Sequence, residues 1–155
     1  MNPARSSIVV TVALLAVSIS LARDHNRSTE EKNAGIYAEL GKAPQKARDR
    51  VSPLENDPEA VAAGRLLFED HCMECHGESA EGGNGKSGRK GPNLRAPQVQ
   101  NATPGSLFWL LTNGVVRKGM PVWSKLPEPQ RWQLISFIQS LEPGEATENK
   151  AAAKP

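Results

Sequence analysis

The sequence has little of several features that other classes of protein need. Cys72 and Cys75 are the only cysteines among 155 residues, which argues against a thiolate zinc site because such sites usually use more soft ligands. The formal net charge is only +2, so we expect no nucleic-acid partner. No segment alternates convincingly between apolar and polar residues at period two, the pattern of a half-buried β-strand. The chain is therefore predicted to be all-α.

The strongest signal is the run Cys72-Met73-Glu74-Cys75-His76. C-x-x-C-H is the attachment signature of a c-type haem, because two thiols on one helical turn can add to the haem vinyl groups. The imidazole that follows can coordinate the iron. A redox disulfide is the alternative, but a thioredoxin-like motif needs a βαβ context that the sequence lacks. We predict that Cys72 and Cys75 bind haem and that His76 is an iron ligand.

A second axial ligand has to come from another part of the chain. Met73 and His71 lie too close to the cysteines to reach the opposite face of the haem, and His25 lies just after the predicted leader sequence. Met120 is the preferred candidate, since the glycine before it allows close backbone approach and the proline after it stiffens the loop. Thioether ligation favours ferrous iron and raises the reduction potential.

The residues Gly91-Pro92-Asn93-Leu94 follow a glycine-rich loop at 77–91, for which no regular element is predicted. A ligating imidazole usually donates its other N–H to a fixed acceptor. The carbonyl of Pro92 is the candidate acceptor for His76, and a simple turn is the alternative interpretation.

The N-terminus has the pattern of a targeting segment. Ile8 to Ala22 is largely apolar, but as a helix it would span about 22 Å, short of a hydrocarbon core of roughly 30 Å. Small residues at Ser20 and Ala22 fit signal-peptidase cleavage. Residues 1–22 are predicted to be a signal peptide, with a membrane anchor through residues 8–22 as the alternative. Either reading predicts a periplasmic or otherwise exported protein, as a covalent haem requires in bacteria.

The rest of the chain is predicted to have three parts. Residues 23–56 are polar and are interpreted as an extension or linker, 57–142 as the folded domain that contains the haem motif, and 143–155 as a disordered tail. Within the domain, Asp57 and Thr103 each precede a proline, the signal for a helix N-terminus.

Three helices are predicted from these signals and from the apolar spacing. The first covers Glu59 to His71, with Val61, Gly64 and Phe68 on one face. The second follows Thr103 and ends at Asn113-Gly114, and the third begins near residues 127–129.

From Asp57 to Leu141 the sequence resembles class I cytochrome c, the small bacterial monohaem type with His/Met ligation. The matching residues are Gly64, Phe68, Cys72, Cys75, His76, Gly91-Pro92-Asn93-Leu94, Gly119-Met120-Pro121, Leu134, Ile135 and Phe137. The resemblance implies three to five helices around one covalently bound haem, with Gly64 and Phe68 meeting Phe137 where the first and last helices cross. It also implies that Pro92 supports His76 and that Met120 binds the iron.

The predicted function is that of an electron carrier and not of an enzyme. The haem iron would cycle between Fe(III) and Fe(II) with both axial ligands kept, and no open coordination site is predicted. Expected partners are a periplasmic dehydrogenase, a bc-type complex or a terminal oxidase. Two alternatives stay open: a haem c subunit of a larger periplasmic dehydrogenase or oxidase complex, and a haem-based ligand sensor with a labile Met120.

Charge is distributed unevenly along the chain. Between Gly77 and Leu126 only Glu78 and Glu81 oppose seven basic residues, which are Lys86, Arg89, Lys90, Arg95, Arg117, Lys118 and Lys125. This excess predicts a basic docking face for an acidic partner. A solvated mixture of charges is the alternative.

Overall fold

A computed structural model describes residues 34–82 and 91–141 of the chain. These residues are helical and contain no β-strand, only an isolated antiparallel bridge between Val115 and Met120. The chain divides into two compact units, residues 1–35 and 36–155, and the described residues from 36 onward belong to the second. The all-α prediction is confirmed.

Three helices of ten or more residues form the frame of this unit: α3 (Pro58–His71), α6 (Pro104–Asn113) and α7 (Glu128–Ser140). The first two begin at the predicted caps. The side chain of Asp57 accepts hydrogen bonds from the backbone amides of Glu59 and Ala60. The side chain of Thr103 accepts one from the backbone amide of Ser106. The predicted helix starts and the glycine that follows α6 are confirmed.

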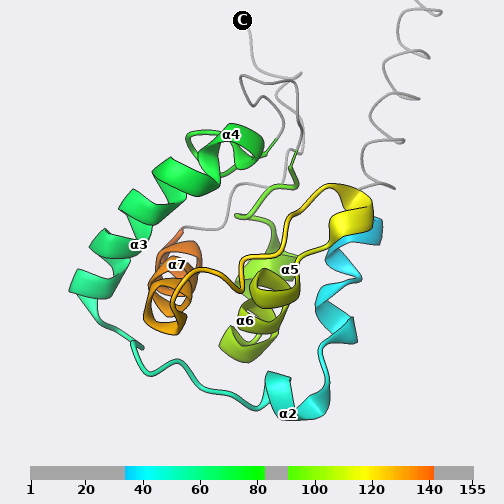
Figure 1. Ribbon diagram of the computed structural model, residues 1–155, viewed down its shortest axis with the longest axis horizontal. Helices are drawn as coiled ribbons and strands as arrows, with labels where there is room; N and C mark the ends of the chain where they lie inside the picture. The colour runs from blue at the N-terminus through cyan, green and yellow to red at the C-terminus, as the bar shows by residue number, and fades with distance from the viewer. Residues whose placement is uncertain (1–33, 83–90, 142–155) are drawn as a thin grey trace, which may run out of the picture. The chain divides into compact units, whose positions relative to one another are not determined.

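Shorter elements connect and flank this frame (Figure 1). They are η1 (Leu40–Lys42), α2 (Gln45–Arg48), α4 (Met73–His76), α5 (Pro97–Gln100) and η2 (Val116–Lys118). The predicted count of three to five helices thus describes the long helices and omits several single turns. A single turn satisfies few of its own backbone groups and leaves a weak sequence pattern.

Helices α3 and α7 touch at Gly64. A Cβ atom at this position would lie 1.9 Å from the backbone oxygen of Gln133 and 2.9 Å from Cβ of Phe137. The rings of Phe68 and Phe137 lie beside this contact, with centroids 5.2 Å apart. The contact that the family resemblance implies is confirmed. Ala60 is buried on the same helix as Gly64 and Phe68, and Val61 is partly buried.

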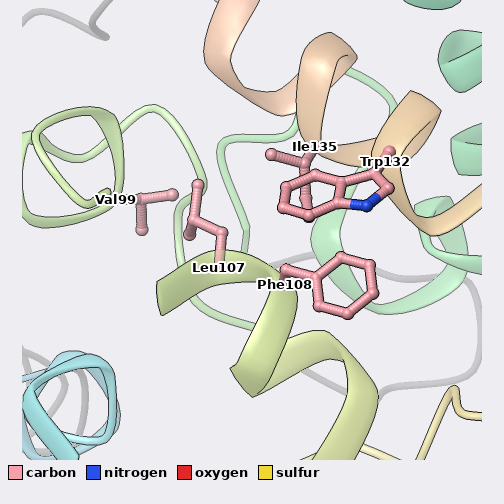
Figure 2. Packing of buried hydrophobic residues seen from close by; sticks show 5 residues of the cluster. All are labelled: Val99, Leu107, Phe108, Trp132 and Ile135. Carbon is pink, nitrogen blue, oxygen red and sulfur yellow. The ribbon is translucent and has the colours of Figure 1, made fainter. Parts of the chain in front are cut away.

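The core has two parts. One cluster, drawn in Figure 2, consists of Val99, Leu107, Phe108, Trp132 and Ile135. Its Phe108 and Trp132 rings stack with centroids 4.3 Å apart. The second cluster, called here the haem-side cluster, consists of Phe68, Ala80, Leu111 and Leu134.

Residues 36–56, part of the predicted polar extension, pack on the helical frame. Gly105 at the start of α6 approaches α2 so closely that a Cβ would lie 1.9 Å from the Ala47 oxygen. Arg50 pairs with Glu128 of α7 at 2.6 Å. This part of the chain therefore lies against α6 and α7, although the division at residue 57 stays a prediction.

Several predictions concern residues outside those described. They are the signal peptide or anchor at 1–22, the tail at 143–155 and residues 83–90 of the glycine-rich loop. Within the described ranges, no helix combines the length and the apolar character needed to cross a bilayer.

Candidate haem site

The motif residues lie on one tight turn at the end of α3. Cys72 closes α3 and opens α4, and its carbonyl accepts hydrogen bonds from the amides of Cys75 at 3.1 Å and His76 at 3.0 Å. Both cysteines are free thiols and partly buried. Burial, and secondarily the neighbouring Cys75, raise the pKa of Cys72 to about 12. The turn thus presents two thiols and one imidazole together, as the motif predicts.

The ring of His76 is oriented by a single backbone acceptor. Its Nδ1 atom lies 2.9 Å from the carbonyl oxygen of Pro92. A carbonyl only accepts hydrogen bonds, so Nδ1 carries the proton and Nε2 keeps its lone pair. Burial lowers the pKa of His76, and the bond to Pro92 opposes that effect. The imidazole is therefore neutral, which is the form that binds a metal.

Three consecutive carbonyls of residues 92–94 each accept a side-chain hydrogen bond. The first bonds to His76, the second accepts from the Tyr37 hydroxyl at 3.0 Å, and the third accepts from Nε2 of Gln100 at 2.7 Å. This series fixes the loop behind the imidazole. Sequence analysis missed Tyr37 and Gln100, because a bond to a distant backbone carbonyl leaves no residue pattern.

Gly91 is needed for close packing against the imidazole. A Cβ here would lie 2.9 Å from the oxygen of Cys75 and 2.9 Å from Nδ1 of His76. The Gly91 amide also donates to the Cys75 oxygen at 2.7 Å. Any side chain at this position would press on the ring that the loop holds.

The loop of the predicted second ligand is closed by its own backbone. Val115 and Met120 exchange hydrogen bonds, with N···O distances of 2.9 and 3.3 Å. Gly119 adopts a left-handed conformation with φ of 93°, which a residue with a side chain would resist. The amide of Trp123 donates to the oxygen of Leu111 at 3.2 Å, which ties the end of the loop to α6.

Cys72 and Met120 pack against the same haem-side cluster. The structure thus brings one predicted attachment residue and the predicted second ligand to a shared apolar surface. Trp123 also packs there, and its ring lies 5.4 Å from that of His71.

The structure describes two of the three other ligand candidates, Met73 and His71. Met73 also packs against the haem-side cluster, but it lines a cavity of about 610 Å³ with Phe68 and Phe137 to which neither His76 nor Met120 contributes. His71 is exposed, and His25 lies outside the described residues. Met120 stays the preferred candidate on the sequence argument, since Met73 and Met120 pack against the same cluster.

The residues at this site fit a haem. A neutral imidazole, a thioether and two thiols are the groups that class I c-type haem uses. Gly91 leaves room for the imidazole where a Cβ would intrude. The apolar haem-side cluster beside these groups is suited to cover a porphyrin.

Comparisons with known proteins agree with this fit. The family model described as "Cytochrome C oxidase, cbb3-type, subunit III" matches residues 59–138. The cbb3-type cytochrome c oxidase subunit CcoP of Rubrivivax gelatinosus is 28% identical over 123 residues, which cover 78% of this chain and 36% of that protein. The chain thus spans about a third of the length of this relative.

A solved structure, cytochrome CL from the marine methylotrophic bacterium Methylophaga aminisulfidivorans MPT, is 28% identical and matches with a TM-score of 0.48 over 58% of each chain.

Proposed function

Because this chain belongs to the family described as cytochrome c oxidase, cbb3-type, subunit III, we propose that it carries single electrons between protein partners outside the cytoplasm. Membership means that its all-α unit is a cytochrome c fold and that its cofactor is covalently bound haem c with iron. When bound, this group supplies a one-electron Fe(III)/Fe(II) couple.

The observation that carries the proposal is the hydrogen bond between His76 and the Pro92 carbonyl, next to the two thiols. It fixes the tautomer and the direction of the imidazole, so that Nε2 is the nitrogen left to ligate. Cys72 and Cys75 would hold the group through thioether bonds. A ligand fixed in this way changes little between the two oxidation states, which suits electron transfer.

Met120 is proposed as the second axial ligand. Its backbone is paired with Val115, and its side chain packs on the haem-side cluster. A loop held in this way keeps the thioether in place and limits the access of water. With His76 and Met120 both holding the iron, the haem would offer no open site for catalysis.

A docking face beside the Met120 loop is part of the proposal. Val116 and Val122 are exposed to 66% and 47%, and the basic side chains of Arg117 and Lys125 are exposed near them in the chain. An apolar centre with positive charge around it suits an acidic partner protein. The rate of electron exchange with such a partner is expected to fall as salt is added, and a rate independent of salt would contradict this docking mode.

A second candidate is a haem c subunit of a larger oxidase. The similarity to CcoP, itself an oxidase subunit by name, favours it. The two candidates differ in how the native protein is isolated. A carrier is recovered alone from the periplasmic fraction, whereas a subunit is recovered from solubilised membranes together with other chains. The same fractionation tests whether the predicted segment 1–22 exports the chain.

The test of the site is absorption spectroscopy of the haem-loaded protein with two matched variants, Met120→Ala and Met73→Ala. The wild type is expected to be low-spin, with the weak ferric iron–thioether band and no binding of carbon monoxide at neutral pH. Met120→Ala should lose the band and bind carbon monoxide, and Met73→Ala should retain the wild-type spectrum. A wild type that lacks the band or binds carbon monoxide would exclude Met120 as a stable ligand and would favour a ligand sensor.

A further inference from the structure

The segment ahead of α2 contacts the loop behind His76. The ring of Tyr37 packs against the core cluster of α6 and α7, and its hydroxyl donates to the oxygen of Asn93 at 3.0 Å. Asn93 directly follows Pro92, whose carbonyl holds the imidazole. A ring fixed in the core thus supports the peptide next to the one that orients His76.

The same segment contacts the loop of Met120. Oε1 of Glu39 lies 3.3 Å from Nζ of Lys118, the last residue of η2 and only two positions before Met120. Figure 1 shows the segment that begins the second unit, drawn in blue, beside the yellow turn η2. Glu39 also pairs with Lys42 at 2.8 Å, and its side chain is only 15% exposed. Hydrogen bonds from Lys42 and Lys118 keep the pKa of the Glu39 carboxyl group below its ordinary value. The bond from Lys42 has the larger effect.

We propose that residues 36–42 form a clamp that holds both ligand loops of the haem in place, with Tyr37 and Glu39 as positioning residues. The inference rests on the proposed function, because it assumes that His76 and Met120 bind the iron. The clamp lies outside residues 59–138, the part that matches the family model.

The geometry gives the clamp a definite mechanical role. Its two contacts arise from residues two positions apart, so they move together, whereas Asn93 and Lys118 lie on different loops. A displacement of Met120 would move the η2 turn and strain the Glu39–Lys118 pair. Loss of the Tyr37 hydroxyl loosens the peptide beside Pro92 and weakens the hydrogen bond to His76.

The experiment measures how tightly added imidazole binds the ferric haem protein, since imidazole competes with Met120 for the iron. Glu39→Gln and Lys118→Gln are each expected to raise the association constant about two- to fivefold. The association constant of the double variant should be no higher than that of either single variant, because both substitutions remove the same contact. Lys42→Gln is the matched control, since it breaks a pair of Glu39 that does not touch the ligand loop, and it should leave the constant unchanged.

Tyr37→Phe tests the other contact, because it keeps the ring in the core and removes only the hydroxyl. The reduction potential of the haem in this variant should rise, since a weaker hydrogen bond from His76 to Pro92 makes His76 a poorer electron donor to ferric iron. The clamp is overturned if Glu39→Gln and Lys118→Gln bind imidazole like Lys42→Gln, if their effects simply add, or if Tyr37→Phe keeps the wild-type potential. Failure of the proposed function looks different, because the wild type would then lack the iron–thioether band from the outset.

Discussion

Adding one methyl group at Gly64 is the sharpest test of the frame that holds the site. The Cβ of Gly64→Ala would lie 1.9 Å from the Gln133 oxygen, where ordinary contact begins at 3.4 Å. The obstacle is backbone, so no side-chain rotation relieves it. Helices α3 and α7 would have to separate locally by about 1.5 Å, the difference between those two distances.

The expected cost follows from two opposing terms. Overpacking a well-packed core costs about 1–3 kcal/mol, and a backbone obstacle favours the upper end. Alanine recovers about 1 kcal/mol of helix propensity relative to glycine. The net loss in the free energy of unfolding is therefore about 2 kcal/mol, a large share of the stability of a domain this small. Phe68 and Leu134, each 1% exposed, lie at the same interface and would lose contact.

The assay is equilibrium denaturation of the haem-loaded protein, followed by circular dichroism. Gly41→Ala is the matched control, because a Cβ at Gly41 meets nothing within 4 Å. It should leave stability unchanged or raise it by about 0.4–1 kcal/mol through the unfolded state. If Gly64→Ala proved as stable as wild type while Gly41→Ala behaved as expected, the close contact between α3 and α7 would be refuted.

Three further predictions concern single contacts. Asp57→Ala removes the cap of α3 and should cost about 1 kcal/mol in chemical denaturation, whereas Asp57→Asn should cost less. The pKa of Glu128 is lowered, first by its hydrogen bond from Arg50, so the folded state binds fewer protons than the unfolded state at mildly acidic pH. The stabilisation is present above the ordinary carboxyl pKa and is lost as pH falls through the lowered value; Glu128→Gln should flatten this dependence in acid titrations of stability, and an unchanged profile would contradict it. Gly91→Ala would place a Cβ 2.9 Å from Nδ1 of His76, so the reduction potential of the haem protein should shift, and a wild-type value would mean that the loop moves freely.

Features encoded within a few residues could be predicted from the sequence. The two thiols and the imidazole share one turn, so C-x-x-C-H by itself specifies their proximity. The caps Asp57 and Thr103 act on amides two or three positions away, and their residue types name their role. The phase of the buried face is less certain, because neighbouring positions on a helix differ by only about 100°. On α3, Ala60 is buried and its neighbour Val61 is partly buried.

Close contacts between helices could be predicted from the sequence only in part. The spacing placed Gly64 on one helix face with Phe68, and only the family resemblance supplied Phe137 as the partner. Gly105 is not among the residues that match the family, so no partner was predicted for it. Its contact with the Ala47 oxygen at 1.9 Å shows that part of the segment interpreted as a linker packs on α6.

The sequence by itself determined the cofactor chemistry, the helical class and the starts of the main helices, because each depends on side-chain type at short spacing. Only the tertiary structure decided that Tyr37 supports the loop of Pro92 and that Glu39 reaches Lys118. The physical reason is that Tyr37 bonds to a backbone carbonyl 56 positions away, and every residue has such a carbonyl. Which backbone carbonyl accepts the hydrogen bond therefore depends on where the folded chain places it.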